Sequence, residues 1–116
     1  GTRRKTMPAF FDKHPDVDGF FCFNDARAWY VYETAARHGL AVGRDISVVG
    51  VDDITGADYF IPPLTTIRQN FDALGHQVLL ATLSALAGET VDLTPAPAQL
   101  CVRSSTAPPR AQRPPA

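Results

Sequence analysis

The chain has 116 residues, of which 45% are hydrophobic and 20% are charged, the composition of one globular domain or of a piece of one. Its formal charge of -1 gives no reason to expect nucleic acid or an acidic membrane as the partner of this segment. No apolar run approaches the roughly 18 residues that span a bilayer, and no signal peptide opens the chain, so a cytoplasmic location is expected.

The first third of the chain predicts a strand followed by a helix. The basic residues 3–5 are expected to form a solvated tail. Residues 17–23 (VDGFFCF) form a short apolar and aromatic run, which predicts a buried strand. Asp25 is a suitable N-cap for the helix that follows, and Gly39 supplies the stop.

The rest of the chain continues the alternation of strands and helices. Residues 46–51 (ISVVGV) predict a second buried strand, and 54–60 a short irregular or helical piece. Residues 64–68 predict a third strand, 71–87 a long amphipathic helix and 98–104 a weaker final strand. This order predicts an α/β fold of three layers, with a mostly parallel sheet and helices on both faces.

Polar residues follow three of these strands at the point where each strand ends. They are Asn24, Asp52 and Gln69, and the aromatic Phe71 comes shortly after the last of them. Ligands of open parallel sheets bind beyond the carboxyl ends of the strands. Amides and carboxylates pair hydroxyl groups while an aromatic ring covers an apolar C–H face, so the pattern indicates a sugar or polyol site.

Helix capping is the alternative role for such residues, because Asn and Asp favour strand-to-helix turns by propensity alone. Asp25 and Asp53 are each the second residue of a pair and are assigned as supporting caps. Three or four hydrogen bonds of about 1 kcal/mol each would give roughly millimolar affinity. A site formed only by the ends of these strands therefore needs a second lobe that closes over the ligand.

The sequence offers no support for a cofactor or a metal. Cys22 and Cys101 match neither a disulfide framework nor a metal-ligand spacing and are expected to be buried apolar residues. His14, His38 and His76 have no partner spacing for a metal or a nucleophilic triad. We therefore expect no catalytic residues and no enzyme.

Four segments together resemble the C-terminal part of LacI/GalR-family transcription regulators. They are FFCFND (20–25), DISVVGVDDI (45–54), YFIPPLTTIRQNF (59–71) and VRSSTAPP (102–109). The resemblance implies a type I periplasmic-binding-protein-like effector domain of two lobes, of which residues 1–106 would be part of the C-terminal lobe. Residues 107–116 would be a disordered proline-rich tail.

The resemblance also implies the partners. Effectors of such proteins are usually sugars and sometimes nucleobases, and the family's effector contacts fall on Asn24, Asp52, Gln69 and, in some members, Phe71. The family acts as a homodimer and binds operator DNA through a helix-turn-helix headpiece, which this chain does not contain.

Two departures from the family pattern concern the surface. Gly43 stands where the family commonly has proline, and Trp29 where it has a small or aliphatic residue. Trp29 and Tyr59 are the candidates for the dimer interface, and a place in the core is the alternative for both.

Other functions remain as alternatives. A transport-linked, periplasmic sugar-binding protein of an ABC transporter would share the fold, and an enzyme could use Asp52 or Asp53 as its carboxylate.

The family layout also predicts an open sheet edge beside residues 20–23, which would invite pairing with another copy.

Overall fold

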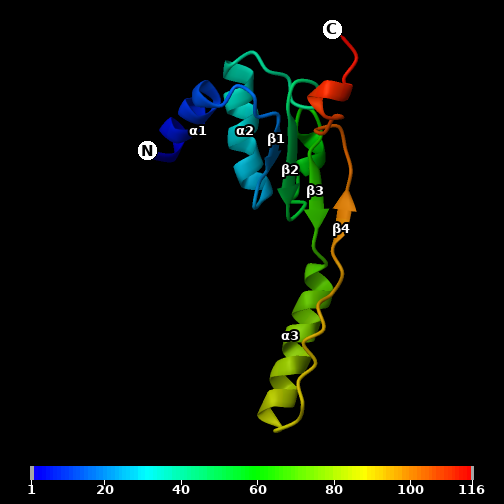
Figure 1. Cartoon of the computed structure of the whole chain (residues 1–116). Coiled ribbons are helices and arrows are strands. Elements are labelled where there is room, and N and C mark those ends of the chain that lie inside the picture. Colours follow the sequence, from blue (N-terminus) through cyan, green and yellow to red (C-terminus); the bar gives the residue numbers. More distant parts are fainter. Residues whose placement is uncertain (1, 116) are drawn as a thin grey trace.

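Four strands form one mixed sheet in the computed structural model, which describes residues 2–115 (Figure 1). The strands lie side by side in the order β1 (Gly19–Phe21), β2 (Ser47–Val51), β3 (Thr65–Arg68) and β4 (Gln99–Cys101). The first three are parallel and β4 is antiparallel to β3. The helices are α1 (Thr2–Lys13), α2 (Asp25–Arg37) and α3 (Phe71–Leu86), with the short 3-10 helices η1 (Ala57–Tyr59) and η2 (Arg110–Gln112). The predicted α/β class with a mostly parallel sheet is confirmed.

The hydrophobic core lies between α2 and one face of the sheet. Its buried residues come from α2, from β2 and from the segments that flank the strands: Ala28, Val31, Tyr32, Ala35, Ile46, Val48, Ala57 and Leu64. Burial alternates along β2, as expected for a strand with one covered face. A Cβ atom at Gly50 would lie 2.1 Å from Oδ1 of Asp25, so only glycine allows the start of α2 to approach β2 this closely.

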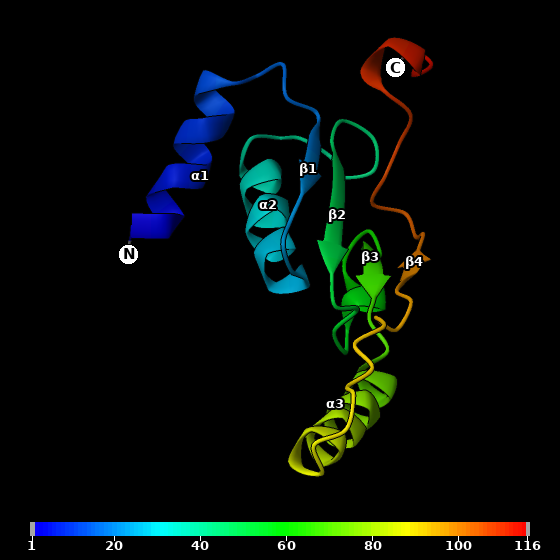
Figure 2. The same ribbon diagram turned by 60° about the horizontal axis from the view of Figure 1, so that its bottom comes forward.

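The second helical layer predicted for the other face of the sheet is not found within residues 2–115. α3 extends away from the sheet (Figures 1 and 2) and has no buried residue. The periodicity of its sequence predicts an apolar face correctly but does not specify what covers that face. The chain runs back along α3, where Nε2 of Gln77 donates a hydrogen bond to the carbonyl of Thr94. No helix in the described range, α3 included, has the length and hydropathy needed to cross a membrane.

The N-terminal residues were expected to form a solvated tail, but the backbone of residues 2–13 forms the helix α1, which lies beside α2. Phe11 of α1 is buried and stacks on Phe20 of β1, with 5.1 Å between the ring centroids. The helix is hard to detect in the sequence because Pro8 lies inside it and its apolar residues lack a clear helical period. Tertiary packing therefore stabilises it.

Residues 107–115, which the sequence predicts to be a disordered tail, contact the start of β2 and the residue before β1. The N–H of Ala107 donates to Oγ of Ser47 over 2.9 Å, and an ion pair of 3.6 Å joins Arg113 to Asp18. The prediction of disorder rests on the prolines of this segment and on its lack of large apolar residues. The arginines supply the contacts that the composition did not reveal.

Candidate functional site

Three of the predicted contact residues follow neighbouring parallel strands at the same edge of the sheet. Asp52 comes directly after β2, Gln69 directly after β3, and Asn24 lies between β1 and α2. Nε2 of Gln69 donates a hydrogen bond to Oδ1 of Asp52 over 2.7 Å. The fold therefore joins two of the predicted residues directly, although they are far apart in the sequence.

Asn24, and not Asp25, is the N-cap of α2. Its Oδ1 accepts a hydrogen bond from the backbone N–H of Arg27 over 2.9 Å. The sequence could not separate the two neighbours because asparagine and aspartate cap helices about equally well. Capping occupies only the amide oxygen, and no acceptor for the side-chain NH2 group is found among residues 2–115.

Asp25, predicted to be a cap, is instead a fully buried carboxylate that joins three elements. Oδ1 accepts from the hydroxyl of Thr66 in β3 over 2.6 Å, and Oδ2 accepts from the N–H of Ile54 over 2.9 Å. The start of α2, the middle of β3 and the loop after β2 are thus held together. The three segments that carry Asn24, Asp52 and Gln69 are positioned by this one side chain.

Asp53 is not a helix cap either, because its carboxylate lies between two arginines. Its oxygens are 2.7 Å from Nε of Arg68 and 2.8 Å from a terminal nitrogen of Arg103. Burial alone would raise the pKa of Asp53, but the hydrogen bonds and charges of both arginines outweigh it and lower the pKa. The ion pairs tie the loop after β2 to the two segments that lead to α3 and return from it.

The backbone at this turn is strained. Asp52 and Asp53 have φ angles of 110° and 51°, in a region that residues other than glycine rarely adopt. Such conformations cost about 1–3 kcal/mol each and concentrate at functional sites. The N–H of Asp52 donates to the carbonyl of Ile67 over 2.8 Å, which helps to hold the conformation.

Phe71 is the first residue of α3, and just over half of its surface is exposed, so its ring is accessible beside Gln69. Asn70, which the sequence analysis did not single out, is the N-cap of α3, with Oδ1 accepting from the N–H of Ala73 over 3.0 Å. The signal was present, since asparagine one residue before an amphipathic run is a common cap.

Trp29 and Tyr59 are not core residues, because 55% and 83% of their surfaces are exposed. Trp29 packs edge-on against Phe60, with 5.3 Å between the ring centroids. Ile61 is also exposed in the same loop. The alternative of burial is therefore excluded, and both residues stay candidates for an interface.

The arrangement suits hydrogen bonding to hydroxyl groups better than catalysis. Asp52 and Gln69 present acceptor oxygens, Asn24 presents an amide donor, and Phe71 presents an apolar ring. Asp53 is neutralised by its arginines. Burial, and then the charge of Asp25, raises the pKa of Cys22 to about 11, which keeps this thiol protonated at neutral pH. Within residues 2–115 no group of three or more His, Cys, Asp or Glu side chains is placed to hold a metal.

Comparison with known proteins agrees with this fold. The periplasmic binding protein-like domain family matches residues 2–106. The sucrose operon repressor of Shigella flexneri is 34% identical over 93 residues, and the HTH-type transcriptional repressor CytR of Escherichia coli K12 is 33% identical over 87 residues. These alignments cover 79% and 75% of this chain but only 28% and 26% of the relatives, so the chain spans under a third of their length.

Solved structures of transcription regulators have the same fold. A LacI family regulator from Arthrobacter sp. FB24 in complex with lactose is 27% identical, with a TM-score of 0.76 over 90% of this chain and 41% of that one. The dimeric Lac repressor with an 11-residue C-terminal deletion is 32% identical, with a TM-score of 0.77 over 90% and 39%. The chain belongs to the periplasmic binding protein-like domain family, in the form found in the effector-binding domains of LacI/GalR-type regulators.

Proposed function

We propose that this chain forms one wall of the effector site of a LacI/GalR-type transcription regulator, and that the effector is a sugar or a similar polyhydroxylated molecule. Asn24, Asp52 and Gln69 contact its hydroxyl groups, and Phe71 covers an apolar face. The observation that carries the proposal is the hydrogen bond between Asp52 and Gln69 at the carboxyl ends of two parallel strands.

A second lobe completes the site. The wall alone offers a few hydrogen bonds, which at about 1 kcal/mol each correspond to roughly millimolar affinity. α3 extends from the binding edge of the sheet with its apolar side chains exposed: Leu74, Val78, Leu79, Leu83 and Leu86. An apolar helix face of this size favours a partner surface, and a lobe packed there would lie beyond the strand ends.

The relatives support the class of effector and the mode of action. One is named for the sucrose operon, one was solved with lactose, and a Lac repressor dimer was solved on its operator with an anti-inducer. The parent regulator would then be a cytoplasmic homodimer that meets operator DNA through a headpiece outside this chain. Trp29 and Tyr59, both exposed, would lie in the dimer interface.

The transport-linked binding protein is the weaker alternative, because the relatives compared above are named as repressors or transcription regulators. An enzyme using Asp53 is disfavoured because two arginines hold its carboxylate. The side chain of Asp52 accepts a hydrogen bond from the neutral amide of Gln69. Among the described residues it belongs to no group of side chains that could hold a metal.

Thermal-shift screening against monosaccharides, disaccharides and nucleobases, up to high millimolar concentration, tests the proposal. We expect a sugar to raise the midpoint of unfolding. Asp52→Ala and Gln69→Ala should each weaken binding of that sugar about tenfold or more, because each removes a hydrogen-bonding group and leaves the other unpaired.

Asp58→Ala is the matched control, since Asp58 is an exposed aspartate in η1 and away from the strand ends. It should leave the affinity unchanged. Unchanged affinity in Asp52→Ala and Gln69→Ala would refute the site, and turnover of the bound sugar would refute the assignment as a binding domain.

A further inference from the structure

A buried threonine of β3 contacts the strained turn that carries Asp52. The hydroxyl of Thr66 accepts a hydrogen bond from the N–H of Asp53 over 3.4 Å and donates one to Oδ1 of Asp25 over 2.6 Å. Thr66 and Asp25 are both fully buried. The hydroxyl has a single proton, which is directed at the carboxylate, so its oxygen accepts from the turn. Thr66 therefore joins this turn to the start of α2.

The turn is held at three consecutive backbone N–H groups. The N–H of Asp52 donates to the carbonyl of Ile67 over 2.8 Å, and the N–H of Ile54 donates to Oδ2 of Asp25 over 2.9 Å. The N–H of Asp53, between them, donates to the threonine hydroxyl. The φ angles of Asp52 and Asp53, 110° and 51°, are unfavourable for residues other than glycine. Such a turn persists only where the surrounding structure holds it, and these hydrogen bonds do so.

The direction of the Asp52 carboxylate depends on this backbone conformation. Its Oδ1 accepts from Nε2 of Gln69 over 2.7 Å. Relaxation of φ toward the common regions would turn the carboxylate away from Gln69 and from the ligand side of the strand ends. An effector would then bind only the fraction of molecules in which the turn is in place, and its apparent affinity would fall in proportion to that fraction. A turn that is held before the effector arrives avoids this loss.

We propose that Thr66 is a positioning residue of the effector site. Its hydroxyl holds the turn at Asp52 and Asp53, so that the Asp52 carboxylate is in place before the effector binds. Because Thr66 is fully buried, it does not touch the effector and acts through the backbone of the turn. The inference rests on the function proposed above for Asp52 and adds the residue that prepares it for binding.

Ser105 offers a matched comparison. Its hydroxyl is also fully buried, accepts from the N–H of Thr65 over 2.8 Å and donates to the carbonyl of Val48 over 2.6 Å. Like the hydroxyl of Thr66, it therefore accepts one hydrogen bond and donates one. These bonds join the first half of β2 to the start of β3, away from the turn that follows β2. Removal of this hydroxyl should destabilise the fold without altering the effector site.

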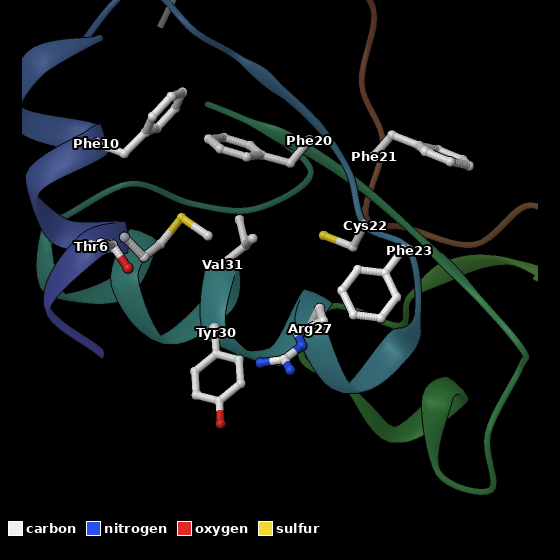
Figure 3. A pocket seen from close by; sticks show the side chains of 10 residues that line it. Thr6, Phe10, Phe20, Phe21, Cys22, Phe23, Arg27, Tyr30 and Val31 are labelled. Atoms are coloured by element: carbon white, nitrogen blue, oxygen red, sulfur yellow. The ribbon is translucent and has the colours of Figure 1, made fainter. Parts of the chain in front are cut away.

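NMR spectra of the 116-residue chain without ligand test whether the carboxylate is held in place. Thr66→Val keeps nearly the same shape but lacks the hydroxyl. In this variant the side-chain amide signals of Gln69 should shift, because their hydrogen bond to the carboxylate is lost. Thr66→Ser, which keeps the hydroxyl, and Ser105→Ala should both retain the wild-type signals. The rings of Phe10 and Phe20, which line a groove between α1 and β1 (Figure 3), report on the rest of the fold and should not shift in any variant.

Titration with the best sugar of the thermal-shift screen tests the effect on binding. Thr66→Val should raise the dissociation constant about fivefold or more, whereas Thr66→Ser and Ser105→Ala should stay within about twofold of the wild type. Urea unfolding should show a loss of stability in both Thr66→Val and Ser105→Ala, so only the positioning role predicts that their affinities differ. If Thr66→Val does not fold, Thr66→Cys takes its place and should show the same changes at smaller size, because a thiol is a weaker hydrogen-bonding group.

Unchanged Gln69 signals in Thr66→Val would overturn the proposal. Unchanged affinity in that variant, where Asp52→Ala weakens binding, would also overturn it. An equal loss of affinity in Ser105→Ala would do the same, since the effect would then follow from stability alone. If the Gln69 signals move in Thr66→Val but Asp52→Ala binds the sugar normally, the effector site itself would be refuted and only the placement of Asp52 by Thr66 would stand.

Discussion

Asp52 and Asp53 are adjacent in the sequence but have different partners in the structure. Asp52 accepts from Gln69 at the strand ends, and Asp53 is held by Arg68 and Arg103. The sequence predicted Asp52 as a contact residue and Asp53 as a supporting residue, because Asp52 comes directly after β2 and Asp53 is the second of the pair. The nature of the support could not be predicted, because Arg103 comes from the far end of the chain and no local pattern pairs it with Asp53.

Asp53→Asn should lower the free energy of unfolding by about 1–3 kcal/mol at neutral pH, because two arginines lose their carboxylate and Arg103 is mostly buried. The pKa of Asp53 in the folded state lies below its ordinary value of 3.8. The contribution of the ion pairs is therefore complete above about pH 4 and is lost as the pH falls through the folded-state pKa.

Urea unfolding of the variant and the wild type, measured from neutral to acidic pH, checks this prediction. The difference in free energy should shrink below about pH 4. Asp58→Asn provides the control at an exposed aspartate and should show no such difference. If Asp53→Asn and the wild type had the same free energy of unfolding at neutral pH, the role assigned to Asp53 would be contradicted.

Asn24 has a capping role in the structure and a contact role in the proposal, and one substitution separates them. Asp caps a helix as well as Asn but cannot donate from an amide. Asn24→Asp should therefore keep the thermal midpoint of the unliganded protein and weaken sugar binding. Asn70→Asp, at the cap of α3, is the control that should change neither. If Asn24→Asp lost stability but kept its affinity for the sugar, the contact role would be refuted and capping would remain as the role of Asn24.

At the scale of elements, a polar contact joins α1 to the C-terminal end of α2 in addition to their apolar packing. Nδ1 of His38 bonds to the carbonyl of Thr34, and Nε2 is 3.0 Å from Oδ1 of Asp12 in α1. The bond to Thr34 and then the bond to Asp12 raise the pKa of His38 above 6.5. The protonated ring is thus favoured in the folded state.

A group with a raised folded-state pKa stabilises the fold fully below its unfolded pKa, and this contribution is lost as the pH rises through the folded-state value. Protection factors for hydrogen exchange in α1 should therefore fall several-fold between pH 6 and pH 9, values that bracket the ordinary histidine pKa of about 6.5. Asp12→Asn should remove most of this pH dependence. An equal fall in the wild type and in Asp12→Asn would contradict the role of the pair.

The elements differ in how far the sequence predicts them. The strands, α2 and α3 follow from apolar periodicity and from stop signals such as Gly39 and Gly88. β1 and β4 are shorter than predicted, because apolar residues continue beyond the hydrogen-bonded positions. α1 was missed because it depends on the packing of Phe11 against Phe20, which no local signal encodes.

At the scale of the whole molecule, the sheet and α3 are two parts joined at the strand ends. The described residues extend over 61 Å in the longest direction, and α3 accounts for the elongation (Figures 1 and 2). The sequence predicted that the site needs a second lobe, from the small number of hydrogen bonds on one wall. It did not predict that α3 would leave the sheet, since its periodicity is the same whichever surface it covers.

The central claim is that the effector binds at the carboxyl ends of β1, β2 and β3. Titration of the isotopically labelled protein with the best sugar of the screen, followed by amide and side-chain NMR shifts, tests it most directly. We predict that the largest shifts fall on Asn24, Asp52, Gln69 and Phe71 and that the region of η2 does not respond. Shifts confined to α1 and the helical face of α2, with none at the strand ends, would contradict the account.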